Sequence, residues 1–103
     1  MKSKLELHVQ EEVDREILHY VREMQGVAPV TIESVHGYLT NAARREVTES
    51  QTRDRVMYLV SAGQLERELE WDGGALELFT ITADGRDVLD GRLPPRGWGR
   101  KGS

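Results

Sequence analysis

The sequence predicts a small α+β domain in which helices fill the first two thirds of the chain and a β-hairpin follows them. Three observations support this fold class. Apolar residues recur at helical spacing in residues 11–25, and also in two later segments, 32–43 and 49–62, the first of which follows a threonine able to cap a helix. Strand-like alternation flanks Asp72 and Gly73. With 103 residues the chain has room for one domain with a modest core.

The first helix is predicted over residues 11–25, and Gly26 follows it where a helix end favours positive φ. Its apolar stripe consists of Val13, Ile17, Leu18, Val21 and Met24. Residues 1–10 are expected to form an N-terminal arm. The alternation of Leu5, Leu7 and Val9 favours an extended arm, whereas a capping box from Ser3 and Glu6 would extend the helix backwards.

Two further helices follow a proline-containing segment, residues 27–30, which suits an edge strand or an extended connector. Thr31 is predicted to cap the second helix and Thr48 or Glu49 to begin the third, with residues 44–47 as the turn and Gly63 as the end. The predicted buried positions are Ile32, Val35, Leu39 and Ala42 in the second helix, and Thr52, Val56, Leu59 and Val60 in the third.

The hairpin is predicted from two strand-like segments joined at Asp72–Gly73 or Gly73–Gly74. On the first strand Leu65, Leu69 and Trp71 alternate with Glu66, Glu68 and Glu70, and we expect Glu77 of the return strand to join the glutamate face. The return strand carries Leu76, Leu78, Phe79 and Ile81. Residues 27–30 can supply a third short strand.

Thr82 is predicted to cap a short last helix, about residues 83–90, that contributes Val88 and Leu89 to the core. Residues 91–103, with their Pro, Gly and basic content, are expected to form a flexible tail. The sequence thus divides into an arm (1–10), a domain (11–90) and a basic tail.

The stretch ESQTRDRVMYLVSAGQLERELEWDGGALELFTITADGRDVL combines several spaced features. They are Leu59 four residues before Gly63, a small hairpin, and then the run Phe79, Ile81, Thr82 and Gly85. With the order of elements over residues 11–90, this stretch resembles the winged helix-turn-helix domain of prokaryotic regulators of the MarR and PadR kinds. The resemblance implies a three-helix core with a two- to three-stranded wing, and double-stranded DNA binding in transcriptional control through residues 49–62 in the major groove.

Side chains on the outer face of residues 49–62 are the candidate DNA contacts. Gln51 pairs well with adenine, arginines reach guanine or phosphate, and a serine near a helix start can help hold a phosphate. Asp54 lies in the middle of this face, where it can accept from cytosine or balance neighbouring arginines, and an ordinary solvated face is the competing interpretation. The candidates on the helix and the preceding turn are Ser50, Gln51, Arg53, Asp54, Arg55, Arg44 and Arg45.

The acidic hairpin argues against simple DNA binding, because a row of glutamates repels phosphate. Either the wing does not reach DNA, or it binds a basic protein partner or the basic tail of a second copy, or the domain is a protein interaction module with a winged-helix fold. Candidate contacts in the tail are Arg96, Trp98, Arg100 and Lys101. A homodimer through Leu5, Leu7 and Val9 is also compatible with the sequence.

The composition of the chain excludes several classes of function and of binding site. The net charge of −4 disfavours a sequence-blind nucleic-acid coat, and the absence of cysteine excludes disulfides and thiolate metal sites. The chain shows no secretory signal and no bilayer-spanning apolar run, so we expect a cytoplasmic protein without membrane contact. His8, His19 and His36 lack metal-ligand spacing, and no catalytic or cofactor-binding motif is present. The expectation is a non-enzyme without metal or cofactor.

Overall fold

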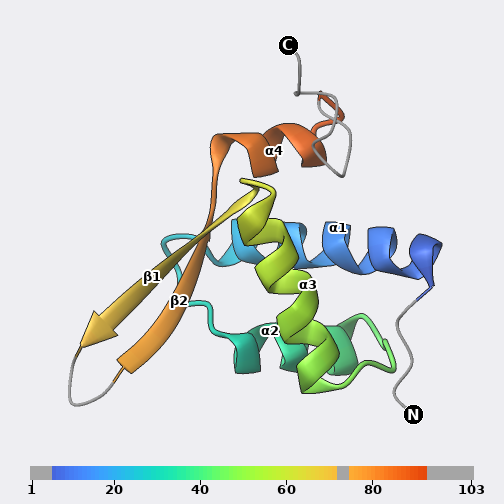
Figure 1. The fold of residues 1–103 in the computed structure, drawn as a ribbon, viewed down its shortest axis with the longest axis horizontal. Helices are drawn as coiled ribbons and strands as arrows, with labels where there is room; N and C mark the ends of the chain where they lie inside the picture. The colour runs from blue at the N-terminus through green and yellow to red at the C-terminus, as the bar shows by residue number, and fades with distance from the viewer. Residues whose placement is uncertain (1–5, 72–74, 93–103) are drawn as a thin grey trace.

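The computed structural model describes residues 6–71 and 75–92 as an α+β fold of helices and a two-stranded antiparallel sheet (Figure 1). Helices α1, α2 and α3 pack on one another, the hairpin extends away from them, and α4 returns to pack against α1. The elements in order are α1 (Leu7–Met24), α2 (Ile32–Gly37), the π-helical turn η1 (Tyr38–Ala42), α3 (Glu49–Ser61), β1 (Leu65–Trp71), β2 (Ala75–Ile81) and α4 (Ala83–Leu89).

Helix α1 begins earlier than expected, so the prediction of an extended arm over residues 1–10 is wrong from Leu7 onward. Gln10 N–H donates to the carbonyl of Glu6 (2.8 Å), and Val9 packs against the core one turn before Val13. Burial of this continued stripe outweighs the local alternation that favoured a strand. Leu7 itself remains 61% exposed, while Ser3 and Leu5 lie outside the described residues.

The second helix starts at its predicted cap. Thr31 and Ser34 form a reciprocal capping box, in which each side chain accepts from the other residue's backbone N–H (3.1 and 2.9 Å). Ile32, Val35 and Leu39 are buried as predicted. Ala42 is exposed, contrary to the prediction, because the last turn is π-helical and its wider winding breaks the 3.6-residue repeat.

Helix α3 matches its prediction closely. Thr48 caps it, and Gly63 ends it with φ of +80°. Thr52, Val56 and Leu59 are buried as predicted, whereas Val60 is only half-buried. His36 of α2 donates from Nε2 to the carbonyl of Val47 (3.0 Å), which fixes the start of α3 against α2.

The hairpin pairs Leu65 with Ile81 and Glu68 with Leu78. Directly opposed residues lie on the same face of an antiparallel pair, so Glu66, Glu68 and Glu70 share a face with Leu76, Leu78 and Thr80. We call the surface formed by those three glutamates and Leu76 and Leu78 the glutamate face. Glu77 lies on the opposite face with Arg67, so the expectation that it joins the glutamates is wrong.

In the described residues the sheet has two strands. The segment before α2 does not pair as a third strand and is a connector. It nevertheless holds the outer edge of β2, because Phe79 N–H donates to the carbonyl of Val30 (3.0 Å) and Ile81 N–H donates to Gln25 Oε1 (3.3 Å).

Helix α4 is tied to the end of α3 through its cap. Thr82 Oγ1 accepts from Gly85 N–H (3.1 Å) and donates to the carbonyl of Gly63 (2.6 Å). Gly85 is buried against the backbone of Gln64.

One hydrophobic core joins these elements. It contains Val13, Ile17, Leu18, Val21, Val30, Ile32, Val35, Leu39, Val47, Val56, Leu59, Leu65, Phe79, Ile81 and Val88. The hairpin runs beyond this core, which leaves Leu69 and Leu76 45% and 47% exposed. A search of the described residues finds no helix with the length and apolar character needed to span a membrane.

Candidate functional site around helix α3

The first turn of α3 exposes part of the predicted contact set. Ser50 and Asp54 are exposed. Gln51 is half-buried, and its side chain already serves the helix, because Oε1 accepts from Thr48 N–H (2.9 Å) while Gln51 N–H donates to Thr48 Oγ1 (3.0 Å). This capping box competes with any contact of the Gln51 amide to a base.

Arg55 faces the interior of the domain. Its Nε and Nη2 donate to the two carboxylate oxygens of Asp14 on α1 at 2.9 and 2.7 Å, and its guanidinium carbon lies 4.5 Å from the ring centre of Tyr58. The two charged side chains are only 14% and 6% exposed. The hydrogen bond that Arg55 donates to Asp14 is the main cause of the raised pKa of Arg55. Arg55 therefore links α3 to α1. We expected its side chain on the flank of α3 that would face DNA, but in the structure it points toward α1.

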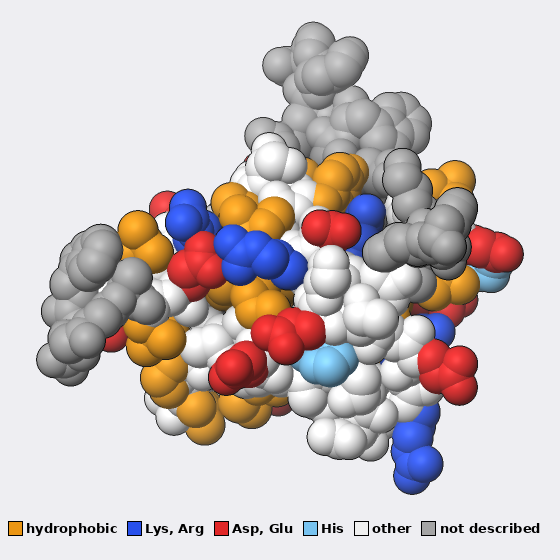
Figure 2. Space-filling view, turned by 60° about the horizontal axis from the view of Figure 1, so that its bottom comes forward, with side chains coloured by type: hydrophobic (Ala, Val, Ile, Leu, Met, Phe, Trp, Pro, Cys, Tyr) orange, Lys and Arg blue, Asp and Glu red, His pale blue; other side chains and the backbone are white. Residues whose placement is uncertain are grey.

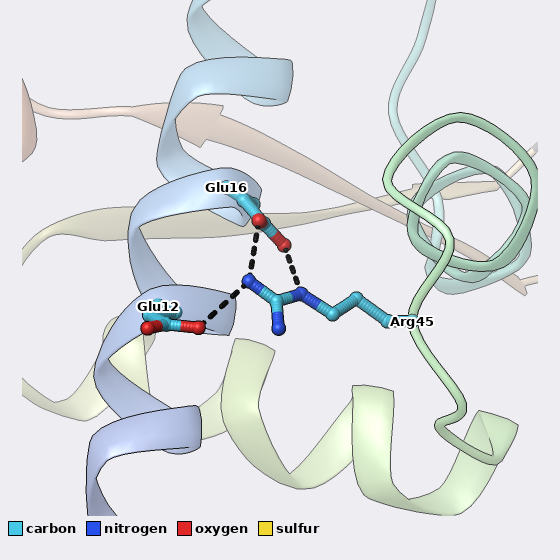
Figure 3. Close-up of polar contacts among 3 residues, drawn as sticks. All are labelled: Glu12, Glu16 and Arg45. Atoms are coloured by element: carbon cyan, nitrogen blue, oxygen red, sulfur yellow. Dashed lines mark hydrogen bonds and ion pairs between the residues drawn. The ribbon is translucent and has the colours of Figure 1, made fainter.

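Arg45 in the turn before α3 is also engaged with α1. It donates from Nε and Nη2 to the two carboxylate oxygens of Glu16 (2.9 and 2.7 Å), and Nη2 also reaches Glu12 (3.0 Å), as Figure 3 shows. The hydrogen bond to Glu16 is the leading cause of the raised pKa of Arg45. This fork-shaped contact holds the turn against α1 and uses the donors that a phosphate would need.

Arg53 lies on the wing side of α3. It donates from Nη1 and Nη2 to the carboxylate of Glu77 on β2 at 2.9 and 3.3 Å, and Arg67 of β1 donates to the same carboxylate (2.8 Å). Arg53 and Arg67 are 48% and 40% exposed, so these contacts are solvent-facing. One carboxylate thus joins α3 to both strands of the hairpin.

The shared contact makes a prediction for the titration of Glu77. Hydrogen bonds from Arg53 and then Arg67 lower the pKa of Glu77 below its ordinary value. A carboxyl whose folded pKa is lowered stabilises the fold above its unfolded pKa, and this contribution is lost as pH falls through the folded value. We expect Arg53→Ala to raise the Glu77 pKa toward the ordinary value, as followed by carbon-detected NMR of its carboxyl.

A matched variant controls the titration. Arg86 on α4 is exposed and has no part in these contacts, so Arg86→Ala should leave the Glu77 titration unchanged. An unaltered Glu77 pKa in Arg53→Ala would contradict the contact.

Two predicted residues keep exposed charges. Arg44 is exposed and adopts positive φ (+59°), and Asp54 is exposed between two arginines that bind other carboxylates. The hydrogen bonds of Arg53 and Arg55 go to Glu77 and Asp14, whereas Asp54 acts on both arginines through its charge. Asp54 adds negative charge to the middle of the outward face.

The space beside the start of α3 is acidic as well. A cleft of about 570 Å³ lies where the first turns of α2 and α3 meet β2. Among its lining residues are Glu33, Glu49 and Glu77, against the single arginine Arg53. A phosphate that approached this end of α3 would meet the carboxylates of Glu33 and Glu49, and Arg53 there is already bonded to Glu77.

The described residues as a whole are strongly acidic. They contain nine arginines, no lysine and seventeen acidic residues, which gives a net charge of −8 with the histidines neutral. On the face drawn in Figure 2, arginine side chains near the hairpin lie in contact with acidic ones, and hydrophobic side chains gather along the hairpin. The basic residues that offset this charge belong to residues 1–5 and 93–103.

The remaining candidates do not form a second site. The predicted tail contacts Arg96, Trp98, Arg100 and Lys101 lie outside the described residues. Within 6–71 and 75–92, no group of three or more His, Asp or Glu side chains is arranged to hold a metal ion.

Sequence reasoning missed the carboxylates that bind the arginines, namely Asp14, Glu12, Glu16 and Glu77. One signal was present: Asp14 lies three and four residues before Ile17 and Leu18, inside the buried stripe of α1, where a charge needs a partner.

A scan against protein-family models finds no match for this chain, and a search of curated proteins also finds none.

Proposed function

We propose that this chain is a winged helix-turn-helix domain that binds another protein through its acidic hairpin, without binding DNA. The main observation behind the proposal is that most arginines around α3 are hydrogen-bonded to carboxylates of the same chain. Three of the four arginines on α3 and its preceding turn, Arg45, Arg53 and Arg55, donate to carboxylates of the same chain. The order of helices and the two-stranded hairpin are compatible with a winged-helix arrangement and support the fold part of the proposal.

Electrostatics supports protein binding over DNA binding. Association with DNA is driven by Lys and Arg side chains that displace counterions from phosphates. Here the chain carries a net charge of −4, and the cleft beside α3 is lined mainly by glutamates among its charged residues. The same charges attract a basic protein surface and raise its association rate.

DNA binding by α3 in transcriptional control is the second candidate. It is favoured by the exposed first turn of α3 with Ser50, by the exposed Arg44, and by the solvent-facing contact between Arg53 and Glu77. Exposed ion pairs contribute little to stability, so Arg53 can exchange Glu77 for a phosphate. Arg55 has no such freedom because its carboxylate partner is buried.

A salt titration with duplex DNA separates the two candidates. We expect the 103-residue chain to show no binding to a labelled mixed-sequence duplex at about 50 mM salt, where cationic side chains bind phosphate strongly. The matched gain-of-charge variant, Glu68→Lys with Glu70→Lys, should acquire weak, salt-sensitive binding. Fluorescence anisotropy measures both.

The opposite pattern would reject the proposal. If the wild-type chain binds the duplex, loses affinity steeply with salt, and loses it again in Arg53→Ala, then α3 is a DNA-reading helix.

A further inference from the structure

We propose that the free edge of β1 binds an extended strand of a partner protein that carries Lys or Arg at alternate positions. This inference rests on the proposed protein-binding function and names the surface and the kind of partner. It follows from the direction of the backbone groups, the charges beside them, and the poor fit of the occupants that the chain itself can supply.

The hydrogen-bond pattern identifies the free edge. Phe79 N–H donates to Val30 and therefore points away from β1. In an antiparallel pair, two directly opposed residues either both direct their N–H and C=O groups toward the partner strand or both direct them away from it. The two arrangements alternate along the strand. Arg67 and Leu69, opposite Phe79 and Glu77, consequently turn their N–H and C=O groups away from β2.

The two edges of the sheet differ in their protection. The connector before α2 covers part of the β2 edge through Val30 and Gln25. Elsewhere in the described residues no segment bonds to the outer backbone groups of Arg67 and Leu69. Edge strands are usually protected by charged side chains, proline or a bulge. β1, LERELEW, has no proline, and its charges are three glutamates against one arginine, so they repel acidic strands and leave the edge open to a basic one.

Side chains along β1 select the charge of the added strand. Glu66, Glu68 and Glu70 are all exposed on one face and would lie beside every second residue of a strand added to the edge. Leu69, on the other face, and Leu76, on the glutamate face, are each nearly half exposed. The surface therefore fits a strand that places Lys or Arg on the glutamate side and includes apolar residues.

A second copy of β1 is a poor occupant. If two β1 strands pair with their glutamate faces on the same side of the joined sheet, glutamates of one copy lie beside glutamates of the other. Like charges on neighbouring strands are destabilising. The chain's own basic segment, residues 93–103, is also a poor strand, because Pro94 and Pro95 lack N–H donors and three glycines follow. A strand from a different protein remains.

The test uses a fluorescein-labelled eight-residue peptide of alternating lysine and valine, with alternating glutamate and valine as the control peptide. We expect the 103-residue chain to bind only the basic peptide, as measured by anisotropy. Strand addition also predicts slower hydrogen exchange at the amides of Arg67 and Leu69, because these outward N–H groups become bonded.

Two variants separate strand pairing from simple charge attraction. Leu69→Pro removes an outward N–H without removing a bond to β2, and the matched Leu69→Thr keeps that N–H. Binding should fall by about tenfold or more in Leu69→Pro and change much less in Leu69→Thr, since backbone pairing gives this mode its affinity. Glu68→Lys with Glu70→Lys should abolish it, and Glu23→Lys on the exposed side of α1 should not.

Each other outcome overturns the inference. Equal binding by Leu69→Pro and wild type would show attraction by charge without strand pairing, and absence of binding to the basic peptide would show that the edge is closed. If Leu69→Pro proves unfolded by circular dichroism, the hydrogen-exchange result and the charge-reversed variant decide. Duplex DNA binding in the same buffer would instead reject the proposed function itself.

Discussion

Asp14→Asn should lower the free energy of unfolding by about 3 kcal/mol or more, because it leaves the Arg55 charge without its carboxylate in a largely buried site. The substitution preserves the size of the side chain, so the effect reports charge and hydrogen bonding. In the wild-type chain, Nε and Nη2 of Arg55 each donate to one carboxylate oxygen of Asp14, at 2.9 and 2.7 Å. Urea unfolding at neutral pH, followed by circular dichroism, measures the loss.

Glu12→Gln is the matched control for burial. It makes the same carboxylate-to-amide change on the same helix, also opposite an arginine, but Glu12 is 56% exposed. Exposed ion pairs contribute about 0–1 kcal/mol, so Glu12→Gln should be near neutral. Replacing both partners, as Asp14→Leu with Arg55→Met, should restore much of the lost stability because no charge is then left buried. Wild-type stability in Asp14→Asn would contradict the buried contact.

Gly85→Ala is expected to destabilise the fold by about 3 kcal/mol, at the upper end of the usual cost of overpacking. A Cβ at this position would collide with the backbone carbonyl of Gln64 and with the Ile81 side chain. A backbone carbonyl cannot rotate away as a flexible side chain can, so α4 or the segment before β1 must shift. A loss of that size should lower Tm by about 15 °C in a domain of this length, as measured by thermal unfolding.

Gly37→Ala controls for the chemistry of the substitution. Gly37 has helical φ and ψ (−61° and −41°), and an added Cβ would meet no atom within 4 Å. Alanine is favoured over glycine in a helix by about 1 kcal/mol, so this variant should be unchanged or slightly stabilised. Similar Tm values for the two alanine variants would rule out the close approach at Gly85.

Local signals in the sequence were sufficient for most of the fold. Threonines with a hydrogen-bonding partner three residues later mark helix starts physically, since their oxygens accept from the first free N–H groups, and Thr31, Thr48 and Thr82 all do so. Helical spacing likewise identified the buried positions Val35, Val56 and Leu59. The start of α1 was missed because Leu7 and Val9 satisfy both helical and strand spacing, and only packing against the core decides.

The chemistry of the α3 surface could not be read from the sequence in the same way. The helical repeat gives the direction of a side chain but not its partner, and the partners of Arg53 and Arg55 are 24 and 41 residues away. The face of Glu77 depended on the strand register, where counting from Leu65 to Ile81 settles which residues oppose each other. Together with the pairing of Arg45 and Glu16, these pairings give three predicted DNA contacts a carboxylate partner within the chain, which is the basis for proposing a protein partner.

The most direct test follows the arginine side chains themselves. In a nitrogen–proton NMR spectrum of the 103-residue chain, the Nε–H groups of Arg45 and Arg55 should give slowly exchanging signals, because each is bonded to a carboxylate at 2.9 Å. Adding duplex DNA at low salt should leave these signals and the α3 amides in place. Displacement of the Arg55 or Arg45 signals together with the amides of Ser50 and Gln51 would contradict the account.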